Sequence, residues 1–86
     1  MDNLESLRQE IDSLDDRIQR LLVQRMKLTD EVGRVKRNEQ RAVLDNHREQ
    51  MIYQHIAATY TDDEAQSLQR IYERIMEESK VRQHRM

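Results

Sequence analysis

Apolar residues recur between residues 4 and 35 at alternating steps of three and four. The series comprises Leu4, Leu7, Ile11, Leu14, Ile18, Leu21, Leu28, Val32 and Val35. This spacing is typical of one buried face of a long helix. Asp2 or Asn3 is placed to cap the helix, which we expect to run to about Arg37 or Asn38 because no proline interrupts it.

One position on this apolar face carries a cation, Arg25. A buried charge is costly unless an opposite charge meets it, so its partner is either a carboxylate of the protein or a bound anionic ligand. Lys36 follows eleven residues later, close to three full turns, and projects from nearly the same face. The two Cα atoms would lie ~16 Å apart. Lys36 therefore either helps Arg25 to grip a small ring-shaped molecule or is simply the exposed helix end.

Two shorter helices follow a connection over residues 39 to 44. Asp45 is the candidate N-cap of the second helix, which we expect to reach about Tyr60. Thr61 and Glu64 match a capping box that opens the third helix, ending near Gln83. The inner face of that helix comprises Leu68, Ile71, Tyr72, Ile75, Ser79 and Gln83.

Composition and length favour an all-α fold in an oligomer. The chain has no proline and one glycine, too few turn residues for a compact β fold. A first helix of about 35 residues is about 50 Å long, whereas a compact globule of 86 residues is only ~30 Å across. We predict a single domain, residues 1 to 86, with three helices, one of them very long. A second copy of the chain is the simplest cover for the rest of the long helix.

Gly33, the only glycine, lies inside the first helix. There it costs about 1 kcal/mol relative to alanine. Either it allows another backbone to approach closely, or it is merely tolerated.

Charge, cysteine content and hydropathy narrow the function classes. The net charge is −2 with both signs interspersed, so we expect no nucleic-acid partner, and Arg34, Lys36 and Arg37 read as a solvated helix end. Without cysteine, disulfides and thiolate metal sites are excluded. No apolar run approaches the ~20 residues of a membrane span, and the start lacks the features of a signal peptide. We expect no membrane association and a cytoplasmic location.

Five blocks in order carry a resemblance to a known family. They are Leu7-Arg8-x-x-Ile11-Asp12-x-Leu14-Asp15, Leu21-Leu22-x-x-Arg25, Val32-Gly33-x-x-Lys36, Asp45-x-x-Arg48-Glu49 and Ser79-x-x-x-Gln83. Over about residues 4 to 83 the chain resembles the all-helical class of chorismate mutases. The resemblance implies an intertwined helical homodimer with two equivalent sites. It also implies an enzyme, an isomerase that converts chorismate to prephenate by a Claisen rearrangement in phenylalanine and tyrosine biosynthesis.

The resemblance also implies a substrate-binding set and roles within it. The set comprises Arg8, Arg25, Lys36, Asp45, Arg48, Glu49, Ser79 and Gln83. Arg8 and Arg25 would hold substrate carboxylates. Because seventeen residues separate them, ~25 Å along one helix, Arg8 must come from the partner chain if both serve one site.

The catalytic residues implied by the resemblance are Lys36, Gln83 and Arg25. Lys36 and Gln83 would donate hydrogen bonds to the ether oxygen whose bond breaks, while Glu49 would accept from the ring hydroxyl and Asp45 would organise that end. A pericyclic rearrangement needs no nucleophile, metal or cofactor, and we expect none. What it needs is a substrate held in its reactive shape and donors aimed at the oxygen that gains charge.

Two departures from the family pattern and two rival functions accompany this prediction. Ala42 stands where relatives commonly have proline, and Lys80 stands where an apolar side chain is frequent, which leaves packing or ligand contact there open.

The nearest rival function is an isochorismate pyruvate lyase. The other is a non-catalytic helical dimerisation module in which a carboxylate such as Glu49 neutralises Arg25. Docking onto another enzyme of the aromatic pathway also stays open.

Overall fold

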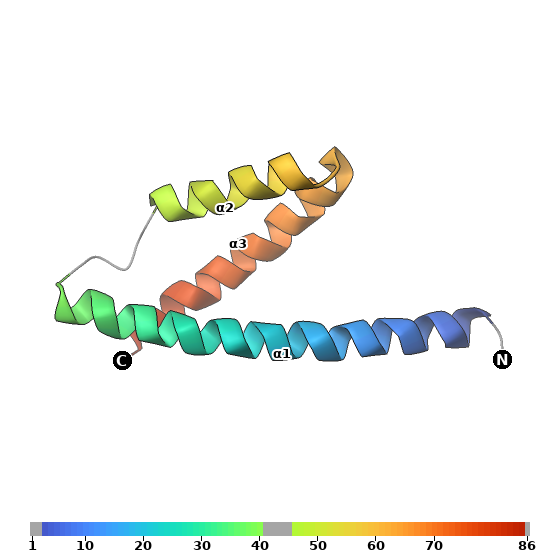
Figure 1. Cartoon of the computed structure of the whole chain (residues 1–86), viewed down its shortest axis with the longest axis horizontal. Helices are drawn as coiled ribbons and strands as arrows, with labels where there is room; N and C mark the ends of the chain where they lie inside the picture. The colour runs from blue at the N-terminus through green and yellow to red at the C-terminus, as the bar shows by residue number, and fades with distance from the viewer. Residues whose placement is uncertain (1–2, 41–45, 86) are drawn as a thin grey trace.

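The computed structural model has three α-helices, and it describes residues 3–40 and 46–85 (Figure 1). They are α1 (Asn3–Asn38), α2 (Asn46–Thr59) and α3 (Asp62–His84). Every regular element in the described part is helical, which confirms the predicted all-α class. Asp2, Ala42 and Asp45, which entered the sequence prediction, lie outside the described residues.

The 36 residues of α1 form one continuous helix, as the apolar periodicity predicts. The structure is 56 Å along its longest axis, close to the length of this helix alone. In Figure 1, the N-terminal half of α1 extends well beyond the part of the chain where α3 crosses it. Leu7, Ile11 and Leu14 on that half are each more than half exposed. The predicted overhang of the long helix is thus present in the single chain.

The start of α3 is fixed by the predicted capping box. The backbone N–H of Glu64 donates to the Thr61 side chain (3.3 Å), and the Thr61 N–H donates to the Glu64 carboxylate (3.2 Å). Two backbone donors at the helix start are satisfied in this way. The chain therefore reverses direction within Tyr60 and Thr61, so that α3 returns beside α2.

α3 packs against both other helices, and α1 and α2 make no comparable contact within the described residues. Figure 1 shows α3 running from the end of α2 back to the C-terminal half of α1. The core of the single chain is small. Its buried side chains comprise Ile56, Met76, Thr29 and Gln83, the last two of them polar. Polar side chains therefore make up half of the small buried set, Thr29 on α1 and Gln83 on α3.

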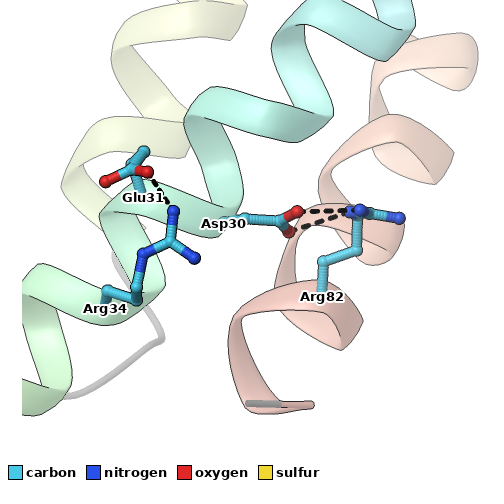
Figure 2. A network of polar contacts seen from close by, with 4 residues as sticks. All are labelled: Asp30, Glu31, Arg34 and Arg82. Carbon is cyan, nitrogen blue, oxygen red and sulfur yellow. Dashed lines mark hydrogen bonds and ion pairs between the residues drawn. The ribbon is translucent and has the colours of Figure 1, made fainter.

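An ion pair fixes how α3 crosses α1 (Figure 2). The Arg82 guanidinium donates through Nε and Nη2 to the two oxygens of Asp30, at 2.9 and 2.8 Å. This two-bond arrangement is specific in direction as well as attractive. The hydrogen bond from Arg82 lowers the pKa of Asp30, although partial burial acts the other way. Beside it, Glu31 and Arg34 form a pair within α1 that is exposed to solvent.

None of the described helices combines the length and the apolar character that crossing a membrane requires.

Candidate active site

All three helices line a cavity of about 430 Å³ at the place where α3 crosses α1. Its volume lies in the range of small-molecule sites. The polar lining comprises Arg25, Thr29 and Lys36 of α1, Arg48 and Glu49 of α2, and Ser79, Lys80 and Gln83 of α3. Leu28, Val32, Ile52 and Met76 supply the apolar part of the wall.

The charges around this cavity are strongly unequal. Four side chains of its lining are cations and one is a carboxylate, which leaves a formal excess of three positive charges. The whole chain, by contrast, carries a net charge of −2. A concave surface lined by one sign of charge concentrates oppositely charged molecules. The cavity is therefore suited to a small molecule with more than one negative charge.

Arg25, the cation on the apolar face of α1, is partly buried and points into this cavity wall. Its Nη1 donates to the Ser79 hydroxyl (2.5 Å), and that hydroxyl in turn donates to the carbonyl of Ile75 (2.9 Å). No carboxylate of the described residues forms an ion pair with Arg25. A hydroxyl orients a guanidinium without neutralising it, so the charge of Arg25 is not cancelled by Ser79.

Glu49, the single carboxylate of the lining, pairs with Lys80 rather than with Arg25. The Lys80 ammonium lies 3.3 Å from Oε1 of Glu49 and 3.7 Å from a carboxylate oxygen of Glu77. The hydrogen bond to Glu49 raises the pKa of Lys80. The structural ion pair between Arg25 and Glu49, on which the rival scaffold function depends, is therefore absent from the described chain.

Gln83 is buried at the end of α3 with an unsatisfied side chain. No hydrogen-bond partner for its Oε1 is present among the described residues. Its backbone, in contrast, is held firmly, because Arg37 Nη1 donates to the Gln83 carbonyl (2.9 Å). A buried polar group without a partner requires an explanation, and a ligand that supplies the missing partner is one.

Gly33 explains how the end of α3 reaches this position. A Cβ atom at Gly33 would lie 3.1 Å from the Cα and 3.3 Å from the carbonyl oxygen of Gln83. Of the two explanations left open by the sequence, close backbone approach is the one observed. The glycine lets α3 settle onto α1 with the Gln83 side chain at the cavity wall.

The predicted site residues fall into three groups. Six of them line the cavity: Arg25, Lys36, Arg48, Glu49, Ser79 and Gln83. Arg8 lies on the overhanging, exposed half of α1, away from this cavity lining. Asp45 lies outside the described residues.

Sequence reasoning missed several groups that shape the cavity. Thr29 is buried in its wall, four residues after Arg25 on the same face of α1, and that spacing is the signal that would have found it. Arg37 is exposed, as expected for a solvated helix end, and its guanidinium also donates to the Gln83 carbonyl. This contact joins residues 46 positions apart, and no local pattern encodes it.

In the described chain, no three His, Cys, Asp or Glu side chains are grouped to hold a metal ion.

The helical fold and its cavity define a class: all-helical proteins with a cationic cavity between their helices. Comparison with family models places the chain within this class. The model of chorismate mutase type II matches residues 7–84, and the chain belongs to this family. Comparisons with curated proteins and with solved structures returned no match. Family membership confirms the resemblance seen in the sequence, and with it chorismate mutase activity.

Proposed function

We propose that the cavity between α1, α2 and α3 is the site at which this chain rearranges chorismate to prephenate, and that two copies of the chain complete it. The observation that carries the proposal is the excess of three positive charges in a cavity of about 430 Å³. Chorismate is a small cyclic dianion, so its charge is opposite to that of the lining. We further propose that the reaction serves phenylalanine and tyrosine biosynthesis in the cytoplasm.

Arg25 and Arg48 are suited to the substrate carboxylates. A guanidinium is planar, permanently charged and able to donate two parallel hydrogen bonds to one carboxylate. Ser79 keeps Arg25 in one orientation, because its hydroxyl accepts from Nη1 while donating back to α3. Holding both ends of a flexible dianion restricts it to the shape in which the two reacting carbons meet. This restriction accounts for part of the acceleration.

Lys36 and Gln83 are suited to the ether oxygen. In the rearrangement the bond between this oxygen and the ring breaks while a carbon–carbon bond forms, and the oxygen gains negative charge as its bond stretches. Fixed donors aimed at an oxygen that gains charge stabilise the transition state more than the substrate. Rotation of the buried Gln83 amide about its terminal bond turns its NH₂ group into the place of its unsatisfied oxygen. Glu49 is then suited to accept a hydrogen bond from the ring hydroxyl.

A second copy of the chain is the proposed cover for the apolar face of α1. Ile11 and Leu14 are exposed by 53% and 51% in the single chain and belong to a row of exposed apolar side chains along α1. A contiguous exposed apolar surface is typical of an interaction site. A second hollow of about 350 Å³, lined by apolar side chains such as Leu22, Met26 and Ile75, adjoins the cavity through Arg25. We propose that the partner's α1 packs there. Arg8, exposed on the overhanging half of α1, then enters the cavity of the other chain.

The test is an assay of the purified full chain with chorismate and, separately, with isochorismate. We expect chorismate to disappear and prephenate to form at a rate far above that of the uncatalysed reaction. Salicylate formation from isochorismate would instead assign a lyase. Sedimentation of the same sample should give the mass of two chains. Absence of both products, together with no binding of a dicarboxylate mimic of the transition state, would refute the proposed function.

A further inference from the structure

Lys80 is a cavity residue without a role in the function proposed above. It follows Ser79 on α3, lines the same cavity, and its side chain is 32% exposed. Its ammonium lies between two carboxylates of different surroundings. Glu49 belongs to the cavity and its side chain is 25% exposed, whereas Glu77 is 60% exposed on the outer surface of α3.

The shorter of these two contacts is the one inside the cavity. Nζ of Lys80 lies 3.3 Å from Oε1 of Glu49, against 3.7 Å from Glu77. The hydrogen bond from Lys80 occupies Oε1, which leaves Oε2 of Glu49 as the oxygen that a bound hydroxyl can use. A carboxylate held at one oxygen loses rotational freedom, so the direction of its second oxygen becomes fixed.

The contact also has an electrostatic consequence for the rest of the cavity. Glu49 shares this lining with three further cations, Arg25, Lys36 and Arg48. A carboxylate without a dedicated partner is attracted to such cations. A cation that pairs with the carboxylate is then no longer available to bind an anionic substrate. Lys80 comes from the opposite helix, α3, and supplies the charge that Glu49 requires.

We propose that Lys80 is a positioning residue that holds the Glu49 carboxylate so that its second oxygen accepts a hydrogen bond from a ring hydroxyl of the substrate. This inference rests on the proposed function, because it takes the Glu49 cavity as the substrate site. It makes Lys80 a determinant of specificity for a hydroxyl-bearing cyclic dianion. Lys80 does not contact the reacting atoms.

The test is a double-mutant cycle between Lys80 and Glu49. We expect Lys80→Met to raise KM about fivefold with kcat within about twofold, since the contact it supports is made equally in the ground and transition states. Lys80→Arg, which keeps the charge, should recover most of the affinity. In a Glu49→Gln background, Lys80→Met should change KM by less than about twofold, because the group it positions is already neutral.

The matched control is Glu77→Gln, which removes the other carboxylate beside the same ammonium. It should leave KM within about twofold of that of the unmodified chain. An effect of Lys80→Met that is equally large with and without Glu49→Gln would overturn the proposal, as would a KM unchanged by Lys80→Met. Circular dichroism and sedimentation of each variant identify any loss of folding.

A binding measurement separates this inference from the proposed function. Calorimetry with a hydroxyl-bearing cyclic dicarboxylate, which mimics the transition state, gives the same cycle in Kd without turnover. Coupling between Lys80 and Glu49 in Kd, in a chain that forms no prephenate, would refute the proposed function and uphold the role of Lys80. Prephenate formation without such coupling would uphold the proposed function and refute the role of Lys80.

Discussion

The backbone of Gln83 lies against Gly33 so closely that a Cβ atom at position 33 would be 3.1 Å from the Cα of Gln83. The added Cβ atom would meet the backbone of Gln83 rather than the end of a flexible side chain, so a change of side-chain rotamer cannot relieve the contact. The two helices must separate by a few tenths of an ångström to admit it. The residue whose amide is proposed to meet the ether oxygen is the one that would move.

Gly33→Ala is therefore expected to impair catalysis more than stability. Alanine favours the helix by about 1 kcal/mol, and this gain offsets part of the cost of separating α1 from α3. Displacement of a positioned donor by a fraction of an ångström is expected to lower kcat about tenfold. Steady-state kinetics and thermal unfolding measure the two effects. Gln24→Ala, at an exposed position of α1, is the control, and an unchanged kcat in Gly33→Ala would contradict the expectation.

Lys36→Ala removes the proposed cation beside the ether oxygen. Loss of one fixed donor to a developing oxyanion costs about 10²–10³ in kcat, and we expect a drop of that order with a folded dimer retained. Lys27→Ala removes a lysine from the exposed surface of the same helix and should leave kcat unchanged. Turnover of Lys36→Ala within a few-fold of the unmodified chain would refute the role of Lys36.

Gln83→Glu replaces a donor that needs no proton with one that does. The amide donates at any ordinary pH, whereas the introduced carboxyl donates only in its protonated form. We expect kcat/KM of Gln83→Glu to be about 10²-fold low near neutral pH and to rise toward the level of the unmodified chain as the pH falls. Rate profiles between about pH 4.5 and 8 test this, since the amide itself does not titrate. Parallel profiles for the two proteins would show that position 83 does not act as the donor.

Arg8→Ala and Arg25→Ala test whether two chains share a site. Each homodimer should be inactive, because every site lacks one guanidinium. After mixing and re-pairing, a heterodimer has one site with both residues and one with neither. Random pairing makes about half of the dimers mixed, so we expect about one quarter of the normal activity. A mixture that stays inactive after confirmed exchange of chains would argue against the shared site.

Asp30→Asn tests the pair that fixes the crossing of α1 and α3. The pKa of Asp30 is lowered in the folded chain by its hydrogen bond from Arg82. A carboxylate with a lowered pKa stabilises the fold above its unfolded pKa, and this contribution is lost as the pH falls through the folded pKa. We expect Asp30→Asn to unfold a few degrees below the unmodified chain at pH 7.

The difference between the two proteins should begin to shrink as the pH falls below the ordinary carboxyl pKa of 3.8, and it should disappear below the lowered pKa of Asp30 in the folded chain. Thermal unfolding followed by circular dichroism from neutral to acid pH gives both curves. Glu31→Gln is the matched control, because Glu31 is the next residue and pairs with Arg34 on the exposed surface of α1. Its effect on Tm should be small at every pH. A difference for Asp30→Asn that persists at low pH would show that packing, not charge, is responsible.

The local sequence pattern was sufficient to predict the helices and to identify the family. The 3–4 spacing of apolar residues predicted α1 to within a residue at each end, and the Thr61–Glu64 capping box predicted the start of α3. Both signals arise from interactions between residues at most a few positions apart, which a single sequence displays directly. The five spaced blocks likewise identified the family that the comparison with family models confirms. The catalytic roles of the residues in those blocks remain predictions.

How α3 docks onto α1 was decided only in three dimensions. The sequence left open whether Gly33 permits close approach, and it did not indicate that the exposed Arg37 also binds the Gln83 carbonyl. It gave no hint of the Asp30–Arg82 pair or of Lys80 as the partner of Glu49. These contacts join residues from about 30 to more than 50 positions apart. Periodicity reports which face of a helix is apolar, but not the angle and register at which two faces meet. Side-chain partners across the crossing depend on that register, and therefore only the tertiary structure determines them.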